Sequence, residues 1–411
     1  MSEQQVVVLG AGMVGVCTAL HLQRRGCTVI LIDKGEAGGE TSYGNAGIIQ
    51  REAVEPYAFP RDFLSLFNVA SKRDTAVNYH LRALPQYVRP LFHYWANSAP
   101  SRYGAIAQAY RTLIEHSISE HSVLIEQSNA HDLITRTGWI QAFRSPHLLD
   151  AASRRAERLS DYGVTSQTLD RTALQAQEPA LQNTLIGGIH WLQPWCCNEP
   201  GELVQRYLAT FIRLGGQLLR GDARTLRQAG AGWAVQTEHG PIEAAQAVVA
   251  LGPWSAQLLQ AIDYRLPLFA KRGYHAHFTG GATLSRPVMD AEKGYMLAPM
   301  KRGTRLTTGA EFAPLTAPAT PVQLTKVQTA ARQILALGAQ LESTPWLGAR
   351  PCTGDMKPII GPAPLHKGLW FNFGHAHQGF TLGPVSGRLL AEMMVGEETV
   401  VEAGAFDAGR F

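Results

Sequence analysis

The chain contains 411 residues, of which 45% are hydrophobic and 17% are charged, and its formal net charge is +4. This composition is typical of a globular enzyme, and the length exceeds that of the usual single core, so we expect two lobes. The charge is only mildly positive, and the sequence has no dense block of lysine and arginine. Both observations argue against a nucleic-acid partner.

Other features indicate the compartment. Five cysteines are too few for a disulfide framework, and the sequence has no apolar run of about 18 residues that could span a membrane. We expect the first strand to begin at Val6, with no charged and apolar leader before it. The sequence therefore predicts a cytoplasmic protein, with peripheral attachment to the inner membrane as an open alternative.

The most informative motif stands near the start of the chain. A β-branched run at residues 6–9 leads into Gly-Ala-Gly-Met-Val-Gly at residues 10–15, as expected for a buried parallel strand followed by a turn. Gly10 allows a tight turn, Gly12 lets the backbone approach a pyrophosphate, and Gly15 lets the next helix, expected at residues 16–25, lie close to the sheet. The anion would meet free N–H groups at the positive end of that helix.

A second apolar run, residues 28–32, ends at Asp33, which follows Gly15 by 18 positions. This is near the spacing of about 20 expected for an acid that accepts hydrogen bonds from a ribose hydroxyl. A carboxylate there would repel a 2′-phosphate. The strand, the glycines, the helix and the acid together predict a dinucleotide site for FAD or NAD and disfavour NADP.

The next part of the chain predicts a loop and a helical insertion. Residues 38–47 are rich in small residues, so we expect backbone that lies against a flat or charged group. Residues 59–130 place large apolar side chains at helical spacing. An aromatic stripe in this insertion favours packing against the core, with contact to lipid or a partner as the alternative. The stripe consists of Tyr87, Leu91, Phe92, Tyr94 and Trp95.

The remaining elements alternate between strands and helices. Residues 266–306 predict an antiparallel sheet that faces a ligand, and residues 311–345 predict a proline-rich turn and an amphipathic helix. A final helix in the tail places Gly383 and Gly387 on its packing face. Further strands are expected at residues 138–143, 187–192, 216–226, 233–237 and 247–251, and a further helix at residues 202–214.

Several separated motifs, in this order, resemble those of the FAD-dependent D-amino-acid oxidase superfamily, and most of all its bacterial D-amino-acid dehydrogenases. The likeness covers nearly the whole chain. The motifs are residues 10–15 with Asp33, Thr41-Ser42, Asn45-Ala46-Gly47, Ala250-Leu251-Gly252-Pro253-Trp254, Gly348-Ala349-Arg350-Pro351 followed by Asp355 and Pro358, and Gly374-His375 before Gly379.

The resemblance implies an α/β fold with two domains. One is an FAD-binding Rossmann-like domain of the glutathione reductase type, and the other is an α+β substrate domain with a mixed sheet. We expect the discontinuous FAD-binding domain at residues 1–58, 193–262 and 346–411. The substrate or cap domain then comprises residues 59–192 and 263–345, with the helical insertion near residues 60–130.

The resemblance also implies which residues hold FAD. The glycine motif and Asp33 would hold the ADP half, Thr41 and Ser42 would reach the pyrophosphate, and residues 45–48 would back the isoalloxazine. Backbone near Thr225 would meet the adenine. N–H groups of residues 375–381 would stabilise negative charge on the reduced flavin. The expected set is Gly10, Ala11, Gly12, Met13, Val14, Gly15, Asp33, Lys34, Thr41, Ser42, Asn45, Ala46, Gly47, Ile48, Thr225, Gly252, Trp254, Gly374, His375, Gln378, Gly379, Phe380 and Thr381.

Three residues are implied at the substrate. Arg350 would pair with the substrate carboxylate, because a guanidinium is a planar bidentate donor, and an ordinary ion pair is the alternative. Tyr295 would offer its hydroxyl to the substrate, or stand as a half-buried strand tyrosine. His377 would line the active site. The pairs at positions 275/277 and 375/377 lack a third ligand nearby, so we predict no metal.

Two departures from the related bacterial enzymes concern Arg272, where they usually have lysine, and Ala349, where they usually have leucine. Both changes bear on substrate preference. Sarcosine oxidases bond the flavin through a cysteine, whose position falls at Gly348 and not at Cys352. We therefore predict that FAD is bound non-covalently.

The expected activity is the oxidative dehydrogenation of a D-amino acid, with hydride transfer from Cα to flavin N5 and an imino acid that hydrolyses to a 2-oxo acid. No strong general base is needed. The alternative substrate is D-proline or cis-4-hydroxy-D-proline, which would give a pyrroline carboxylate. We expect a quinone as electron acceptor. A further alternative is a non-catalytic flavoprotein subunit that docks to partner subunits through the helical insertion.

Overall fold

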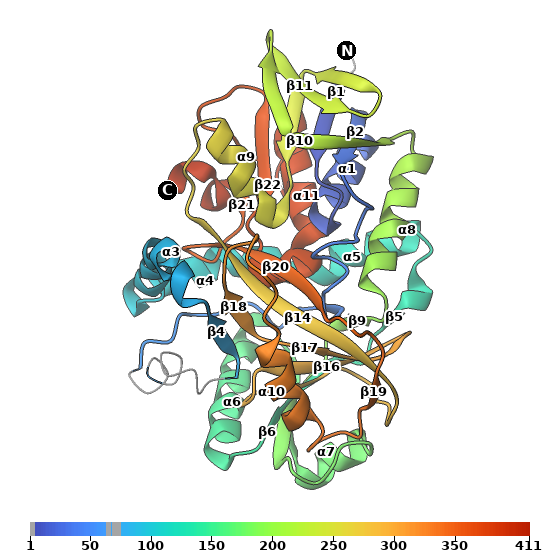
Figure 1. Ribbon diagram of the computed structural model, residues 1–411, viewed down its shortest axis with the longest axis vertical. Coiled ribbons are helices and arrows are strands. Elements are labelled where there is room, and N and C mark those ends of the chain that lie inside the picture. Colours follow the sequence, from blue (N-terminus) through green and yellow to red (C-terminus); the bar gives the residue numbers. More distant parts are fainter. Residues whose placement is uncertain (1–4, 63–66, 68–74) are drawn as a thin grey trace.

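The computed structural model describes residues 5–62, 67 and 75–411, which form two lobes, each built around a large sheet (Figure 1). The first sheet has the order β12-β11-β10-β2-β1-β13-β22-β21. Its central strands, from β10 to β22, pair in parallel, and antiparallel pairs flank them on both sides. The strands are β1 Gln5–Leu9, β2 Thr28–Asp33, β10 Gln217–Ala229, β11 Gly232–Thr237, β12 Gly240–Ala244, β13 Gln246–Val249, β21 Ile359–Pro362 and β22 Leu369–Phe373.

Segments from both ends of the chain meet in this lobe. Helix α1 Met13–Arg24 follows β1 and packs against α11 Gly379–Val395 and α8 Pro200–Arg213. The helix pair is close because a Cβ at Gly383 would lie 2.6 Å from Met13 Cγ, and one at Gly387 would lie 2.8 Å from the carbonyl carbon of Cys17. These two glycines therefore face the packing partner, as the sequence predicts.

The second lobe is built on an eleven-stranded sheet of order β4-β18-β14-β17-β16-β15-β6-β8-β7, with β19 and β20 also paired to β14. Helices α6 Pro146–Leu159, α7 Arg171–Gln177 and α10 Val322–Ala331 belong to this lobe (Figure 1). The strands are β4 Val77–Tyr79, β6 Trp139–Phe143, β7 Ser166–Asp170, β8 Gly187–Trp191, β14 Leu268–Gly280, β15 Val288–Asp290, β16 Tyr295–Met300, β17 Gly303–Thr307, β18 Ala310–Phe312, β19 Gly338–Gln340 and β20 Trp346–Thr353.

A small sheet and a short helix complete the framework. Strands β3 Ile48–Ile49, β9 Trp195–Cys197 and β5 Ile134–Thr135 form the small sheet, and α9 Ser255–Ala261 follows β13. Within residues 5–62 and 75–411, no helix is long and apolar enough to cross a membrane.

The helical insertion comprises α3 Leu84–Asn97, α4 Pro100–Glu115 and α5 Ser117–Gln127; the expected helical residues 63–66 and 68–74 lie outside the described part. The aromatic stripe divides. Tyr87 and Tyr94 are buried, whereas Phe92 and Trp95 are 61% and 39% exposed. The prediction of a core-facing stripe is therefore right for one side of α3 and wrong for the other.

The structure differs from the expected elements in a few places. Strands β4, β7 and β12 are not predicted, because each is short or mostly polar. Residues 346–353, which we assigned to the FAD-binding domain, form β20 and pair with β14 of the second sheet from Leu268↔Thr353 to His275↔Trp346. The last part of the first sheet thus begins at β21, after residue 358.

Candidate active site

The glycine motif forms a cradle at the start of α1. Gly10 has φ of +106°, and a Cβ there would lie 2.5 Å from the carbonyl oxygen of Ala250. A Cβ at Gly15 would overlap the carbonyl oxygen of Gly10, so Gly15 has the packing role that the sequence predicts. Gly12 is the N-cap of α1, it offers no capping side chain, and the first turn carries no acid. The N–H groups of this turn therefore face a site that suits a phosphate.

Asp33 and Ser42 hold this cradle in place. Asp33 ends β2, and its Oδ2 accepts a 2.7 Å hydrogen bond from the Ala11 N–H. Its Oδ1 accepts a 2.9 Å hydrogen bond from the Gly35 N–H. Ser42 Oγ accepts a 3.0 Å hydrogen bond from the Met13 N–H. The carboxylate of Asp33 retains acceptor capacity on both oxygens, as contact with a ribose requires.

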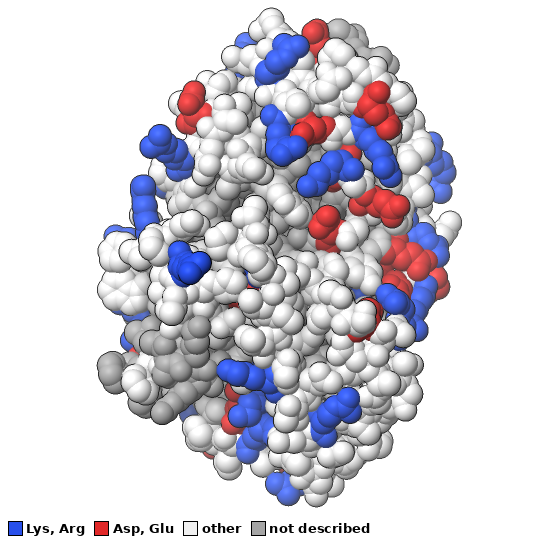
Figure 2. All heavy atoms as spheres, viewed as in Figure 1, with Lys and Arg blue, Asp and Glu red and all other residues white. Residues whose placement is uncertain are grey.

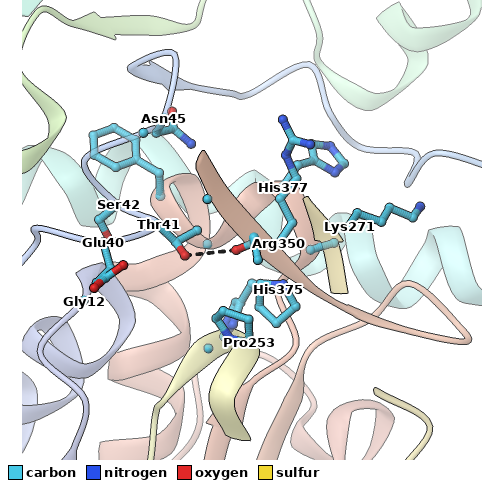
Figure 3. A pocket seen from close by; sticks show the side chains of 18 of the residues that line it. Gly12, Glu40, Thr41, Ser42, Asn45, Pro253, Lys271, Arg350, His375 and His377 are labelled. Carbon is cyan, nitrogen blue, oxygen red and sulfur yellow. Dashed lines mark hydrogen bonds between the residues drawn. The ribbon is translucent and has the colours of Figure 1, made fainter. Parts of the chain in front are cut away.

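A cavity of about 660 Å³ extends from this cradle to the second lobe. Figure 3 shows Gly12, Glu40, Thr41 and Ser42 on one side of it and Arg350, His377 and Lys271 further along. The Thr41 hydroxyl donates a 2.9 Å hydrogen bond to the carbonyl oxygen of Ala349, which ties the loop after β2 to β20 (Figure 3). One continuous space thus joins the nucleotide cradle to strands of the second sheet.

Arg305 fixes the loop that lines the middle of the cavity. This side chain is 1% exposed, and its Nη1 donates hydrogen bonds of 2.7 Å and 2.6 Å to the carbonyl oxygens of Tyr43 and Asn45. Its Nε donates a 3.0 Å hydrogen bond to His277 Nε2, and His277 Nδ1 donates a 2.6 Å hydrogen bond to Glu342. The motif residues Asn45 and Ala46 are therefore held by a buried arginine on β17.

Arg350 lies on β20 and lines the cavity. Its Nη1 donates a 2.9 Å hydrogen bond to the carbonyl oxygen of Gly309, and its Nη2 donates a 3.3 Å hydrogen bond to that of Thr308. Among the described residues no carboxylate pairs with it. The alternative of an internal ion pair is therefore wrong within the described chain. Because a guanidinium has five N–H donors, some remain for a ligand.

Two histidines of the tail line the same cavity as neutral rings. Burial lowers the pKa of His375 to about 3, and its Nε2 lies 3.0 Å from Ser386 Oγ. Loss of solvent, and then the charges of Arg350 and Lys271, lower the pKa of His377 to about 3. The His377 ring stacks at 4.7 Å on that of Tyr57. Both histidines are therefore uncharged at neutral pH, and neither competes with Arg350 for an anion.

Tyr295 lines the cavity from β16, opposite Asp290 on β15. Burial, and then the Asp290 carboxylate, raise the pKa of its phenol. Within the described residues its hydroxyl forms no hydrogen bond. A donor is therefore available for a ligand, and the role of Tyr295 at the substrate stays a prediction.

Most residues expected at the cofactor line this cavity, and six do not. Gly15 packs under the cradle, as described above. Thr225 lies three residues beyond the stretch of β10 that lines the cavity, residues 221–224, because a bulge between Asp222 and Arg227 turns it away. An adenine there would meet residues 221–224, which corrects the expectation. The other four are Gly47, Gly374, Gln378 and Thr381, which bound the neighbouring turns and the start of α11.

Several residues of the cavity are not found from the sequence. Lys271 lines it, whereas its neighbour Arg272 is buried on the other face of β14 and pairs with Glu311 at 2.6 Å. The departure at Arg272 therefore does not concern the cavity wall. Alternation along β14 predicts that only one of the two side chains faces the cavity, but not which one. Tyr57, Met289 and Trp346 also line it.

The residues of the cavity fit an FAD molecule better than a metal. A glycine cradle at a helix start, an acid at the end of β2 and an elongated cavity suit a dinucleotide with a second ring system. Across the described ranges no group of three or more histidine, cysteine or acidic side chains could hold a metal ion. The fold and the site thus define a flavin-dependent oxidoreductase of the two-domain type.

Comparison with known proteins agrees with this class. The model of the family described as FAD dependent oxidoreductase matches residues 5–393, so the chain belongs to this family. It is 28% identical to D-amino acid dehydrogenase of Chromohalobacter salexigens, over 99% of both chains. It is 29% identical to D-amino-acid oxidase of Bradyrhizobium diazoefficiens, again over 99% of both. Glycine oxidase from Geobacillus kaustophilus shares the fold, with a TM-score of 0.76, 19% identity and 99% coverage of both chains.

Proposed function

We propose that this protein is a D-amino-acid dehydrogenase with non-covalently bound FAD, which oxidises the substrate to an imino acid that water then converts to a 2-oxo acid. The observation that carries the proposal is Arg350, a cation in the cavity wall without a carboxylate partner in the described chain. The names of the two relatives described above support a D-amino acid as substrate.

The chain would act mainly by positioning. Bound FAD supplies the hydride acceptor. Arg350 would hold the substrate carboxylate through paired N–H donors and so fix the position of Cα. The acids that line the cavity in the described chain are Asp33, Glu36, Glu40 and Asp222, all on β2, the loop after it or β10. No acid beside Arg350 would act as a base, so the amine would lose its proton to water before the hydride leaves.

A panel of substrates tests this function. The purified holoenzyme would be mixed anaerobically with D-alanine, D-proline, cis-4-hydroxy-D-proline, sarcosine and L-alanine, and the visible flavin absorbance followed. We expect D-alanine to bleach the flavin and L-alanine not to do so. Bleaching by the cyclic imino acids alone would replace the open-chain substrate with a cyclic one. No bleaching by any compound would overturn the proposal.

We also propose that reduced flavin passes electrons to a quinone and that the exposed face of α3 rests on an anionic lipid surface. Residues 75–114 contain four arginines and no acid. Around α3 the surface in Figure 2 is mostly basic, whereas acidic side chains gather toward the upper right. Apolar and basic residues on one helix favour the membrane interface. The apolar face consists of Leu81, Leu84, Val88, Phe92 and Trp95, which are 36% to 66% exposed.

Sedimentation with vesicles tests the lipid contact. We expect the holoenzyme to sediment with vesicles that contain phosphatidylglycerol, and the double variant Val88→Ser and Phe92→Ser to stay in solution. Ile212→Ser on α8 is the matched control, because Ile212 is 48% exposed but lies outside the insertion. Equal sedimentation of all three proteins, or of none, would contradict the lipid contact. Turnover with a soluble quinone compared with oxygen tests the acceptor.

A further inference from the structure

Lys271 is a second cation in the cavity, and the proposed function does not use it. Its residue pairs directly with Arg350 across β14 and β20, so both side chains leave the sheet on the same face. Both line the cavity. Within the described residues Lys271 forms no hydrogen bond and no ion pair. A desolvated ammonium without an acceptor is costly and points to a ligand that supplies one.

Aromatic rings, and no acid, surround the Lys271 ammonium. Its Nζ lies 4.2 Å from the centroid of the Tyr94 ring, 5.6 Å from that of Phe269 and 6.0 Å from that of Phe312. These contacts favour the charged form, whereas burial and the charge of Arg350 lower the pKa of Lys271. The rings stabilise a cation but leave its three N–H donors without an acceptor.

The two cations point apart. The Arg350 guanidinium lies against Gly273, where a Cβ would be 2.9 Å from Nη1, whereas the Lys271 ammonium lies toward Phe269. In Figure 3 the Lys271 side chain extends away from Arg350. Residues 269 and 273 are four positions apart on one strand, roughly 13 Å. One carboxylate would not reach both cations, but a molecule with an acidic group at each end would.

We propose that Lys271 binds the side-chain carboxylate of the substrate, so that this enzyme prefers an acidic amino acid of about the length of D-glutamate. The inference rests on the proposed function, since it takes the α-carboxylate to be at Arg350. Lys271 is then a specificity residue: it touches the far end of the substrate and leaves the reacting Cα to Arg350 and the flavin.

Kinetics with matched substrates test this preference. D-Glutamate and D-glutamine have nearly the same shape and differ in the charge of the side chain. We expect kcat/KM of the wild-type enzyme to favour D-glutamate by about tenfold or more. In Lys271→Met that preference is lost while D-glutamine is oxidised as before, and Lys271→Arg keeps most of it. Equal rates for both substrates in the wild type, or an equal loss for both in Lys271→Met, would overturn the inference.

Binding of unreactive acids separates this inference from the proposed function. Glutarate has two carboxylates and butyrate has one, and each is titrated against the flavin absorbance of the holoenzyme. We expect glutarate to bind more tightly than butyrate in the wild type and equally in Lys271→Met, whose FAD content and melting temperature confirm folding. This result without oxidation of any amino acid would support the second anion site and refute the proposed function. Oxidation of D-alanine without a glutarate preference would do the reverse.

Discussion

Arg305 donates a hydrogen bond from Nε to Nε2 of His277, and this contact holds the arginine against the loop that carries Asn45. Because Nε2 of His277 accepts here, the ring carries its proton on Nδ1, which donates to Glu342. Residues 43–45 are thus fixed from β17 across more than 250 positions of sequence. The loop is part of the cavity wall, so its position should control how well FAD binds.

Removal of this arginine should weaken FAD binding. Arg305→Met leaves the carbonyl oxygens of Tyr43 and Asn45 without their donors, and we expect the dissociation constant of FAD to rise about tenfold or more. Arg305→Lys should lose less, because an ammonium still donates but lacks the planar fork. Titration of apoprotein with FAD measures the effect, with far-UV circular dichroism as the check on folding. An unchanged dissociation constant in Arg305→Met would refute the role.

The contact between α1 and α11 should tolerate no larger side chain at Gly387. A Cβ there would lie 2.8 Å from the backbone of Cys17, so Gly387→Val should lower the free energy of unfolding by about 1–3 kcal/mol or more. The matched control is Gly404→Ala, because nothing lies within 4 Å of a Cβ at that position. Urea unfolding measures both. A loss in the control as large as in Gly387→Val would contradict the packing explanation.

The protein should lose stability as the pH falls from 6.5 to 4. Burial lowers the pKa of His121 to about 4, so the folded protein binds fewer protons than the unfolded chain over this range. The stabilisation is complete above pH 6.5 and is lost as the pH falls to the folded pKa, up to about 3 kcal/mol for this residue. His121→Gln should flatten the pH dependence of the unfolding free energy. The same slope in the variant would exclude His121 as a source.

FAD should leave the protein on acid precipitation. Cys352 lines the cavity, but burial raises the pKa of its thiol, although the charges of Lys271 and Arg350 oppose this. A protonated thiol is a poor nucleophile toward a flavin. We expect a colourless pellet and a yellow supernatant after treatment with trichloroacetic acid. A yellow pellet in the wild type that becomes colourless in Cys352→Ala would instead show a covalent link.

The sequence predicts the parts of the site that depend on local signals. Gly10, Gly15 and Asp33 have the positions in the cradle that their spacing indicates, and Gly383 and Gly387 face α1. These features follow from neighbours along one strand or one helix. The turn of Thr225 away from the cavity depends on a bulge, which leaves no clear mark in the sequence.

The remaining features depend on pairing between distant strands. The position of Lys271 in the cavity, and that of Arg272 outside it, follows from the register of β14 with β20 and β18. A shift by one residue would exchange the two side chains. The contact of Arg305 with Asn45 joins residues 260 positions apart. Such contacts appear only when the fold is known.

The central claim is that Arg350 binds the carboxylate of an amino acid, and the comparison of D-alanine with D-alaninamide tests it most directly. The amide lacks the carboxylate but keeps the amine and the Cα hydrogen. We expect wild-type kcat/KM to favour D-alanine by about a hundredfold, and Arg350→Met to retain FAD but show no preference. A preference for D-alanine of the same size in Arg350→Met would contradict the assignment.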